Sequence, residues 1–235
     1  MDLKRFFSDN KIIGNKIILS GEEFYHAVKV TRHKVGFKII VCDNSNIDYY
    51  ATITEINKDN LIAIIDKKEY NTVESNLDVT LFIGNNKNLD SVVQKSVELG
   101  VKRIVPFTSQ HCNVFDVNYE RLRKIVAESS KQCGRATLAH VEKIKTFKEC
   151  LELVKNSEVF AFYEHEETRK IASFAGDIPS KISIFIGCEG GFSEDEIKEF
   201  NTNGIFPYTL GKRILRVATA VVAACTLIND KFEEL

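Results

Sequence analysis

The sequence predicts an α/β protein with two modules, a small β-rich one at the start and a larger one built on a parallel sheet. In the first module, short runs rich in β-branched residues follow one another with only turn clusters between them. From Leu77 onward, such runs alternate with helical patterns, as in parallel sheets whose strands are connected by helices. Two glycine-bearing loops near the end each follow an expected strand, and open sheets of this class bind ligands at the carboxyl ends of their strands.

The overall composition limits the possible functions. The chain has 235 residues and a formal net charge of -1, so any contact with nucleic acid must come from a local basic patch. No apolar stretch is long enough to span a bilayer, and residues 1–10 carry charge and lack the apolar core of a signal peptide. We therefore expect a cytoplasmic protein with no membrane partner.

The cysteines and histidines show no pattern typical of a metal or disulfide site. The 6 cysteines form no C-x-x-C pair, and the 5 histidines lack metal-ligand spacing. The cysteines are Cys42, Cys112, Cys133, Cys150, Cys188 and Cys225. We expect them to be buried or half-buried free thiols, and we expect no metal cofactor.

The first module is expected over residues 1–72. Lys16–Leu19 has the composition of a strand, and Ser20 with Glu23 forms a capping-box pattern that predicts a short helix. Further strands are predicted at residues 37–42, 47–56 and 61–66. Strands this close in sequence pair as hairpins, which favours a small antiparallel barrel or sandwich. The polar segment 70–76 is the expected linker.

The second module, residues 73–235, alternates between strand and helix patterns. Strands are predicted at residues 77–83, 101–107, 158–163 and 182–186, and helices at residues 89–99, 119–133 and 147–155. The first of these helices has an apolar face and is expected to end at Gly100. Right-handed crossovers then place helices on both faces of a parallel sheet.

The loop Gly187–Phe192, after the strand at 182–186, is the first candidate ligand site. Its glycines permit close backbone approach to a ligand. Ser193 and Glu196 form a capping box ahead of the helix that follows. The loop matches neither G-x-G-x-x-G nor the phosphate-binding P-loop, so a tight strand-to-helix turn without a ligand is the alternative interpretation.

A second candidate site follows a short strand predicted at residues 206–210. The loop 211–216 carries Arg213 and Arg216 among aliphatic residues. A solvated surface explains Arg213, whereas Arg216 adjoins an apolar helix, and arginine is rarely buried unpaired. That helix, residues 217–228, is apolar on nearly all sides, so we expect it to serve both in the core and in a subunit interface.

Three further segments are candidates for contact with RNA. A basic and aromatic spot combines residues 4–7 with residues 29–34, where cations would bind phosphate and phenylalanine would stack on bases. Residues 132–135 end a helix rich in cations, and the polar loop 85–88 lies at the ligand edge of the sheet. An ordinary solvated face, a helix C-cap and a plain loop are the respective alternatives.

Motifs along nearly the whole chain resemble, in the same order, those of one known family. They are Arg5-Phe6-Phe7 with His26–Arg32, Gln94–Val101 (QKSVELGV), Gln132–Arg135 (QCGR), Gly187–Ser193 (GCEGGFS) and Leu210–Arg216 (LGKRILR). The family is that of the bacterial 16S ribosomal RNA (uracil-N3) methyltransferases, S-adenosylmethionine-dependent enzymes of the SPOUT class. Thr31 stands where this family has Leu, Cys188 where it has Pro and Ala218 where it has Glu. We expect the change at Cys188 to loosen the cofactor loop.

The resemblance implies a PUA-like N-terminal β-barrel that binds RNA and a C-terminal parallel-sheet α/β domain with a deep SPOUT trefoil knot. It also implies a homodimer with S-adenosylmethionine bound near the subunit interface. The activity it implies is methylation of N3 of a uridine in the 16S ribosomal RNA of the small subunit. Because Ala218 replaces the usual Glu, a non-catalytic RNA-binding paralogue is one alternative. A SPOUT methyltransferase that acts on another RNA nucleotide is the second.

The resemblance further implies the site residues. Arg216 is expected to be catalytic and to stabilise the developing uracil anion. The expected cofactor-binding residues are Ile186, Gly187, Glu189, Gly190, Gly191, Leu210, Gly211, Ile214 and Leu215. The expected RNA-binding residues are Arg5, Arg32, Lys34, Lys87 and Arg135.

Overall fold

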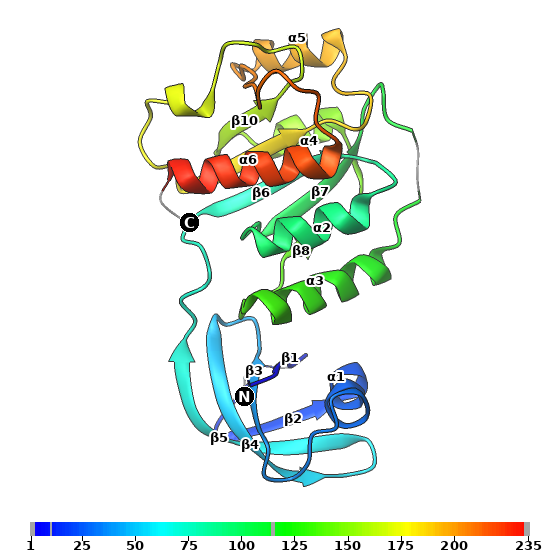
Figure 1. Ribbon diagram of the computed structural model, residues 1–235, viewed down its shortest axis with the longest axis vertical. Helices are drawn as coiled ribbons and strands as arrows, with labels where there is room; N and C mark the ends of the chain where they lie inside the picture. Colours follow the sequence, from blue (N-terminus) through cyan, green and yellow to red (C-terminus); the bar gives the residue numbers. More distant parts are fainter. Residues whose placement is uncertain (1–2, 10, 114–115, 233–235) are drawn as a thin grey trace. The chain divides into compact units, whose positions relative to one another are not determined.

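The structure is a computed structural model of the chain and describes residues 3–9, 11–113 and 116–232. It divides into two compact units, whose elements are labelled in Figure 1. The first unit comprises Met1–Glu74 with Ala127–Leu138, and the second comprises Ser75–Val126 with Ala139–Leu235. The predicted boundary after residue 72 lies near this division, but no sequence pattern predicts that residues 127–138 join the first unit.

The first unit contains a five-stranded, mainly antiparallel sheet. Its strand order is β1 (Arg5–Phe7), β3 (Lys38–Cys42), β4 (Ile47–Ile56), β5 (Asn60–Tyr70) and β2 (Lys16–Ser20). The pairings among β2, β3, β4 and β5 are antiparallel, as the short turn clusters predict, whereas the unpredicted β1 pairs parallel with β3. Alternate side chains point inward along the strands, and Phe6, Leu19 and Ile53 are buried in the core they form.

A short helical segment follows β2, but it does not begin as predicted. It consists of α1 (Gly21–Tyr25) and a π-helical turn, η1 (His26–Val30). The predicted capping box is wrong, because the Ser20 side chain makes no capping hydrogen bond. Glu23 instead accepts a hydrogen bond of 3.0 Å from the Phe7 backbone N–H and forms an ion pair with Lys131. Its carboxylate therefore ties β1 to the segment 127–138 of the same unit.

The second unit is built on a six-stranded sheet in which every pairing is parallel. Its strand order is β10 (Glu158–Phe162), β11 (Lys181–Ile186), β6 (Asp78–Gly84), β7 (Arg103–Thr108) and β8 (His140–Val141), and β9 (Lys145–Thr146) also pairs with β7. The four longer strands are those that the sequence predicts. β8 and β9 are two residues long, which is too short to produce a periodic pattern.

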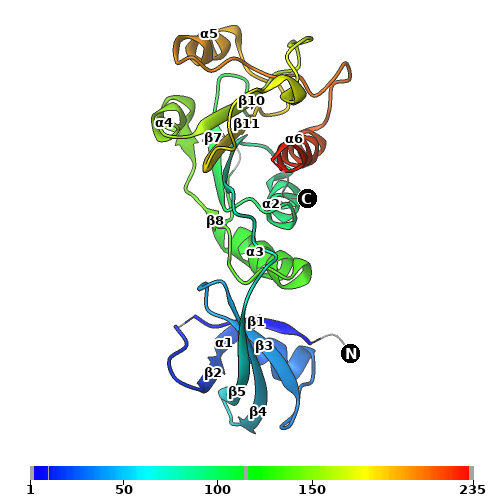
Figure 2. The same cartoon turned by 90° about the vertical axis from the view of Figure 1, so that its left-hand side faces the viewer.

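Helices cover both faces of this sheet, as predicted, and Figure 2 shows the two layers. On one face α2 (Leu89–Glu98) packs against α6 (Val217–Lys231), and α6 contacts β11. On the other face lie α4 (Phe147–Leu153) and α5 (Glu194–Thr202). Phenylalanine rings fill the space beneath α4 and α5, where Phe82 and Phe185 stack with their centroids 4.4 Å apart. Such paired rings stabilise the layer beyond the area they bury.

Both helices on the phenylalanine side begin with capping boxes. Ser193 caps α5 together with Glu196, as the sequence predicts, and Thr146 caps α4 together with Glu149. The remaining helical elements are α3 (Tyr119–Cys133), which has its predicted bounds, and the 3-10 turn η2 (Ile171–Ser173). Across the ranges that the structure describes, no helix has the length and apolar character needed to cross a membrane.

Residues 206–210 do not form the predicted strand. Tyr208 pairs with β10 only through an isolated parallel bridge to Phe162. The Tyr208 N–H donates to the Ala161 carbonyl at 2.7 Å, and the Tyr163 N–H donates to the Tyr208 carbonyl at 3.1 Å. Because Pro207 has no N–H with which to extend the ladder, the segment follows β10 without becoming a strand.

Candidate active site

A cavity of about 500 Å³ lies at the carboxyl ends of the parallel strands of the second unit. Residues that follow β6, β10 and β11 line it, together with the loop before α6. Both glycine-bearing loops therefore line the same hollow, as their places after the strands predict. The lining consists of Lys87, Asn88, Phe162, Tyr163, Glu164, Ile186, Gly187, Cys188, Glu189, Gly191, Leu210, Gly211, Arg213, Ile214, Leu215, Arg216, Val217 and Ala220.

Gly84, the last residue of β6, allows the loop after β11 to come close. A β-carbon at this position would lie 2.3 Å from the backbone nitrogen of Cys188. No side chain tolerates so short a contact with backbone, so only glycine permits this packing. In the sequence Gly84 has the appearance of an ordinary strand end, so no pattern marks it as part of the site.

Gly191 allows Glu164 to reach the same loop. The loop is a tight turn in which the Gly191 N–H donates to the Cys188 carbonyl at 3.0 Å, and Gly191 has a φ of 68°. A β-carbon on Gly191 would lie 1.8 Å from the Oε1 atom of Glu164, which extends from the end of β10. The left-handed φ of the turn therefore favours glycine at this position, and the Glu164 carboxylate occupies the space beside it.

Eight of the predicted cofactor-binding residues line the cavity. They are Ile186, Gly187, Glu189, Gly191, Leu210, Gly211, Ile214 and Leu215. Gly190 does not line it, and its carbonyl oxygen lies 3.0 Å from Nδ1 of His111 instead. Phe162, Tyr163 and Glu164 line the cavity without having been predicted. Their position after a parallel strand is the one signal by which the sequence could have identified them.

Charged side chains of both signs surround the cavity. The cations are Lys87, Arg213 and Arg216, and the carboxylates are Glu164 and Glu189. Arg216 is the N-cap residue of α6, and its carbonyl accepts the Ala220 N–H at 2.8 Å. Arg213 and Arg216 are both exposed, so their guanidinium groups are accessible to a ligand. Among the described residues, no group of three or more His, Cys, Asp or Glu could hold a metal ion.

Comparison with known proteins establishes the family. Residues 73–229 match the model of an RNA methyltransferase domain, and residues 19–66 match the model of an RNA methyltransferase PUA domain. The chain belongs to the RNA methyltransferase family. The PUA match falls on the sheet of the first unit, and the methyltransferase match spans the parallel sheet that carries the cavity.

Two curated bacterial proteins resemble the chain over nearly its full length. The ribosomal RNA small subunit methyltransferase E of Buchnera aphidicola subsp. Schizaphis graminum is 32% identical over 244 residues, which cover 99% of this chain and 96% of that protein. The protein of the same name from Rickettsia conorii is 30% identical over 248 residues, which cover 100% of both.

Solved structures of such methyltransferases have the same fold. Ribosomal RNA small subunit methyltransferase E from Neisseria gonorrhoeae, bound to S-adenosyl methionine, has a TM-score of 0.88 and 28% identity, and the match covers 97% of this chain and 98% of that one. A methyltransferase from Legionella pneumophila in complex with the same cofactor has a TM-score of 0.87, 24% identity and 98% coverage of each chain. Because the Legionella protein is only 24% identical, its similarity supports the fold alone.

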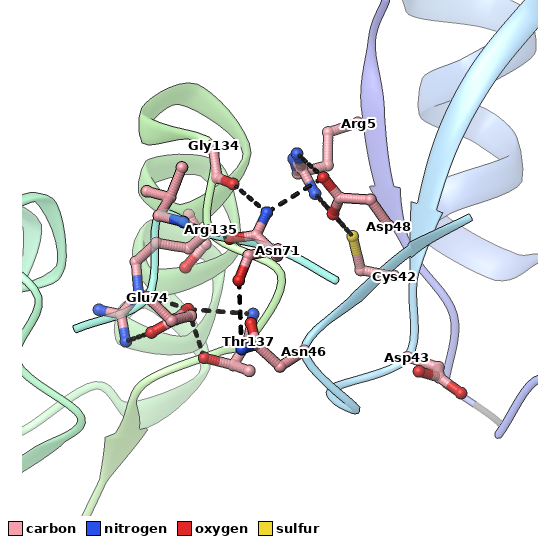
Figure 3. Close-up of polar contacts among 12 residues, drawn as sticks. Arg5, Cys42, Asp43, Asn46, Asp48, Asn71, Glu74, Gly134, Arg135 and Thr137 are labelled. Atoms are coloured by element: carbon pink, nitrogen blue, oxygen red, sulfur yellow. Dashed lines mark hydrogen bonds and ion pairs between the residues drawn. The ribbon is translucent and has the colours of Figure 1, made fainter. Parts of the chain in front are cut away.

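In this member of the RNA methyltransferase family, the Arg5 side chain is 9% exposed and forms an ion pair with Asp48. One Arg5 guanidinium nitrogen donates to Oδ2 of Asp48 at 2.9 Å, and the other lies 2.8 Å from the Cys42 sulfur. Figure 3 shows the Asn71 amide donating both to Asp48 and to the Gly134 carbonyl, each at 3.0 Å. Burial alone would raise the pKa of Asp48, but the hydrogen bond and charge of Arg5 outweigh it and hold that pKa below its usual value.

Arg135 forms a second buried ion pair in the first unit, with Glu74 (Figure 3). Two of its nitrogens each donate to a separate Glu74 oxygen at 3.0 Å, which is the strong bidentate geometry. Arg135 is 2% exposed, so its guanidinium faces the protein interior. This burial argues against the predicted direct contact of Arg135 with RNA. The ion pair of Arg5 with Asp48 likewise argues against a direct contact of Arg5 with RNA.

Arg32 and Lys34 have the opposite environment within the first unit. Both are exposed on the turn that follows η1, where Arg32 adopts a left-handed φ of 56°. The Thr31 hydroxyl lies 2.7 Å from Nδ1 of His33 and fixes the turn between them. Burial lowers the pKa of His33, so the exposed charge of this turn comes from Arg32 and Lys34. Arg32 and Lys34 are therefore both accessible for the predicted contact with RNA.

Proposed function

We propose that the chain transfers the methyl group of S-adenosylmethionine to N3 of a uridine in the 16S ribosomal RNA of the small ribosomal subunit. One observation carries this proposal, namely that both glycine-bearing loops line a single cavity at the carboxyl ends of the sheet. The relatives named ribosomal RNA small subunit methyltransferase E support the substrate class, and the Neisseria structure supports the cofactor. The choice of N3 rests on the resemblance of the motifs to the uracil-N3 enzymes.

The cavity residues fit S-adenosylmethionine, whose sulfonium supplies an electrophilic methyl group. The volume of about 500 Å³ lies within the range of roughly 300–1,000 Å³ found for small-molecule sites. Glycines 187 and 191 let backbone groups approach a ligand, and Ile186 and Leu215 offer apolar surface to a nucleobase. We assign the cofactor to the eight predicted residues that line the cavity, and we leave Gly190 out because its carbonyl faces His111.

Arg216 is the proposed catalytic residue. It ends the second loop, and its exposed side chain lines the cavity. Its positive charge would stabilise the negative charge that develops on uracil as the N3 proton leaves. N3 lies on the Watson–Crick edge, so the target base must be unpaired or flipped before it can enter. Most of the rate enhancement would come from holding N3 in line with the methyl group.

Glu164 is the proposed acceptor of the N3 proton. Of the two carboxylates that line the cavity, it is the one whose oxygen lies against Gly191 of the first cavity loop. Glu164→Gln should lower kcat more than it changes KM. Glu189→Gln removes the other cavity carboxylate, which is assigned to cofactor binding, so it should weaken binding of S-adenosylmethionine more than it lowers kcat. An equal loss of kcat in both variants would remove Glu164 from this role.

The RNA is proposed to contact exposed cations of both units. These are Arg32 and Lys34 on the turn of the first unit and Lys87 at the cavity. Lysine and arginine bind phosphates without reading sequence, which suits a module that positions RNA. Arg5 and Arg135 are proposed to support RNA binding only by stabilising the first unit, because each is held in a buried ion pair.

We also propose that the protein is a homodimer and that its second unit contains the trefoil knot of its SPOUT relatives. Ile214, on the second cavity loop, is 85% exposed, and Leu227 of α6 is 40% exposed. The resemblance to the dimeric family supports the homodimer, and we assign these two exposed apolar side chains to its interface. Sedimentation equilibrium should give the mass of two chains, and Ile214→Asp should shift the protein towards a single chain. A wild-type protein that sediments as one chain would contradict the dimer.

The function is tested by cofactor binding and by mapping the methyl mark. Calorimetry should detect binding of S-adenosylmethionine to the purified protein, and N3-methyluridine should be missing from the 16S ribosomal RNA of cells that lack the gene. A protein that binds RNA but no S-adenosylmethionine would be the non-catalytic paralogue that Ala218, in the first turn of α6, favours. Loss of a mark on another nucleotide would identify a sibling SPOUT activity.

A further inference from the structure

A second cavity, of about 260 Å³, lies in the second unit beside β10, which is an end strand of the parallel sheet. Residues at the end of α4, at the start of β10 and in the segment 203–208 line it, together with Arg169. None of the residues that line this second cavity also lines the first. The second cavity is therefore distinct from the proposed site of methyl transfer.

An arginine stacked on two aromatic rings forms one wall of the second cavity. The guanidinium carbon of Arg169 lies 4.6 Å from the ring centroid of Tyr208 and 5.5 Å from that of Phe206. One guanidinium nitrogen also donates to the Tyr208 hydroxyl at 3.3 Å. Tyr208 is buried, whereas Arg169 is exposed and Phe206 is 51% exposed. The wall thus presents a planar cation and a phenyl ring to a ligand.

Hydrogen bonds of the backbone hold Arg169 in this position. Its N–H donates to Oε1 of Glu166 at 2.8 Å, and its carbonyl accepts the Thr209 N–H at 2.8 Å. The same Glu166 oxygen accepts the Thr168 N–H at 2.8 Å, so a tight turn precedes the arginine. Because the backbone is fixed and the guanidinium rests on two rings, a ligand would not have to order this side chain, which lowers the cost of binding.

The charges in and around the second cavity are balanced. Lys155 lines it but forms an ion pair with Glu152. Glu158 adds a carboxylate to the lining, and the Glu166 carboxylate lies beside the backbone of Arg169. Carboxylates this close offset the attraction of the two cations for an anion. A neutral ligand therefore fits the cavity better than a phosphate does.

The polar groups of the lining suit the edge of a nucleobase. The Ser157 hydroxyl, the Glu158 carboxylate and the Asn203 amide provide hydrogen-bond donors and acceptors beside the stacked wall. Unpaired RNA bases stack on aromatic rings and on arginine planes, and their edges are hydrogen-bonded by such groups. The combination of a stacking wall with a polar rim is therefore typical of a site for one unpaired base.

We propose that the second cavity binds an unpaired base close to the target nucleotide in the same RNA, an inference that rests on the proposed function. Glu158, at the start of β10, lines the second cavity, and Phe162, at its end, lines the first. A strand rises about 3.3 Å per residue, so these two positions are roughly 13 Å apart. A base near the target can reach that far, and its recognition would help to select the substrate.

The test measures binding of the full-length protein to 16S ribosomal RNA by filter binding over a series of salt concentrations. Phe206→Ala should weaken binding roughly fivefold to tenfold, because the stacking of one base is lost. Phe206→Tyr keeps a ring and should bind like the wild type, whereas Phe206→Leu keeps only apolar bulk and should bind like Phe206→Ala. Leu153→Ala, which changes an exposed apolar residue of α4 outside the cavity, should leave the affinity unchanged.

Substitutions of Arg169 separate stacking from attraction to phosphate. Arg169→Lys keeps the charge but loses the plane, so it should weaken binding as much as Arg169→Ala does. Neither should change the slope of log K against the logarithm of the salt concentration. A slope reduced by roughly 0.7 in Arg169→Ala and restored in Arg169→Lys would identify a phosphate contact and overturn the proposal. Thermal unfolding checks each variant, and the Phe206 series decides should the Arg169 variants not fold.

The outcomes also separate this proposal from the proposed function. Affinity equal to that of the wild type in both Phe206→Ala and Phe206→Leu would overturn base binding in the second cavity and leave the proposed function intact. If those variants bind RNA normally but differ from the wild type in sedimentation, Phe206 belongs to a contact between chains and base binding there is refuted. Failure of the wild type to bind 16S ribosomal RNA would refute the proposed function and base binding together.

Discussion

In the first unit Arg5 and Arg135 are buried against Asp48 and Glu74, whereas at the cavity of the second unit Arg213 and Arg216 are exposed. All four belong to motifs that resemble one family, so membership of a motif does not reveal what an arginine does. A guanidinium taken out of water needs a carboxylate partner, because desolvation of a charge costs several kcal/mol. One that stays in water keeps its charge for a ligand. The environment therefore separates an arginine that stabilises the fold from one that is accessible to a ligand.

The largest expected effect is on the first unit. Asp48→Asn leaves the buried charge of Arg5 without its partner, which should lower the free energy of unfolding by about 3–5 kcal/mol. Urea denaturation followed by circular dichroism measures this change. Asp66→Asn is the matched control, since Asp66 is exposed and accepts a hydrogen bond of 2.7 Å from the Thr52 hydroxyl. Its effect should stay within about 0.5 kcal/mol.

The same pair predicts a dependence on pH. The pKa of Asp48 is lowered in the folded protein, so its contribution to stability is present above the unfolded value of about 3.9 and is lost as the pH falls through the lower folded value. The free energy of unfolding of the wild type should therefore fall more steeply below pH of about 4 than that of Asp48→Asn. Parallel curves for the two proteins would show that the ion pair is not the cause.

Arg216→Ala should have the next largest effect, on catalysis and not on stability. Loss of a charge that stabilises the transition state should lower the rate of methyl transfer by about 10²–10³-fold. The affinity for S-adenosylmethionine should stay near that of the wild type. Single-turnover assays and calorimetry measure the two quantities separately. Arg213→Ala, from the same loop, should lose less activity, and loss of cofactor binding in Arg216→Ala would reassign that residue to binding.

Gly84→Ala tests whether the cavity depends on close backbone packing. The added carbon would lie 2.3 Å from the Cys188 nitrogen, so the loop 187–191 must move and affinity for S-adenosylmethionine should fall by roughly tenfold. Gly204→Ala is the control, since Gly204 has a φ of 74° but no atoms within 4 Å of its β-carbon position. That change should reduce stability without altering cofactor affinity, and equal affinities for both variants would refute the packing argument.

The smallest expected effect concerns the exposed cations of the first unit. Arg32→Ala and Lys34→Ala should each weaken binding to ribosomal RNA only a few-fold, and each should reduce the salt dependence of log K by roughly 0.7. Filter binding over a series of salt concentrations measures this slope. Lys58→Ala, an exposed lysine in the turn between β4 and β5, should leave the slope unchanged. An unchanged slope in the first two variants would remove that turn from the RNA interface.

Most of the fold could be predicted because its signals are local. The alternation of strands and helices from Leu77 onward and the capping box at Ser193 each depend on residues that are neighbours in sequence. The cavity could be predicted for a related reason, since loops that follow parallel strands meet at one edge of the sheet. The predictions fail where a residue's contacts are made with a partner that is distant in the sequence. Glu23 could cap α1, but Phe7 and Lys131 take its carboxylate.

The site residues that were missed have the same explanation. Gly84 matters because Cys188 packs on it, and Glu164 because Gly191 leaves room for it. The buried state of Arg5 depends on Asp48, which is remote in sequence and carries no motif. Each of these contacts joins segments whose separation in the chain gives no periodic signal.

Residues 127–138 lie within the sequence of the second unit yet fold with the first. If recombination replaced only residues 1–74 with those of a distant relative, Arg135 would meet a foreign side chain in place of Glu74, and the Gly134 carbonyl would lose the amide of Asn71. A crossover at the obvious boundary would therefore produce mismatched hybrids. The two stretches should be inherited together, and substitutions in one should be accompanied by compensating substitutions in the other.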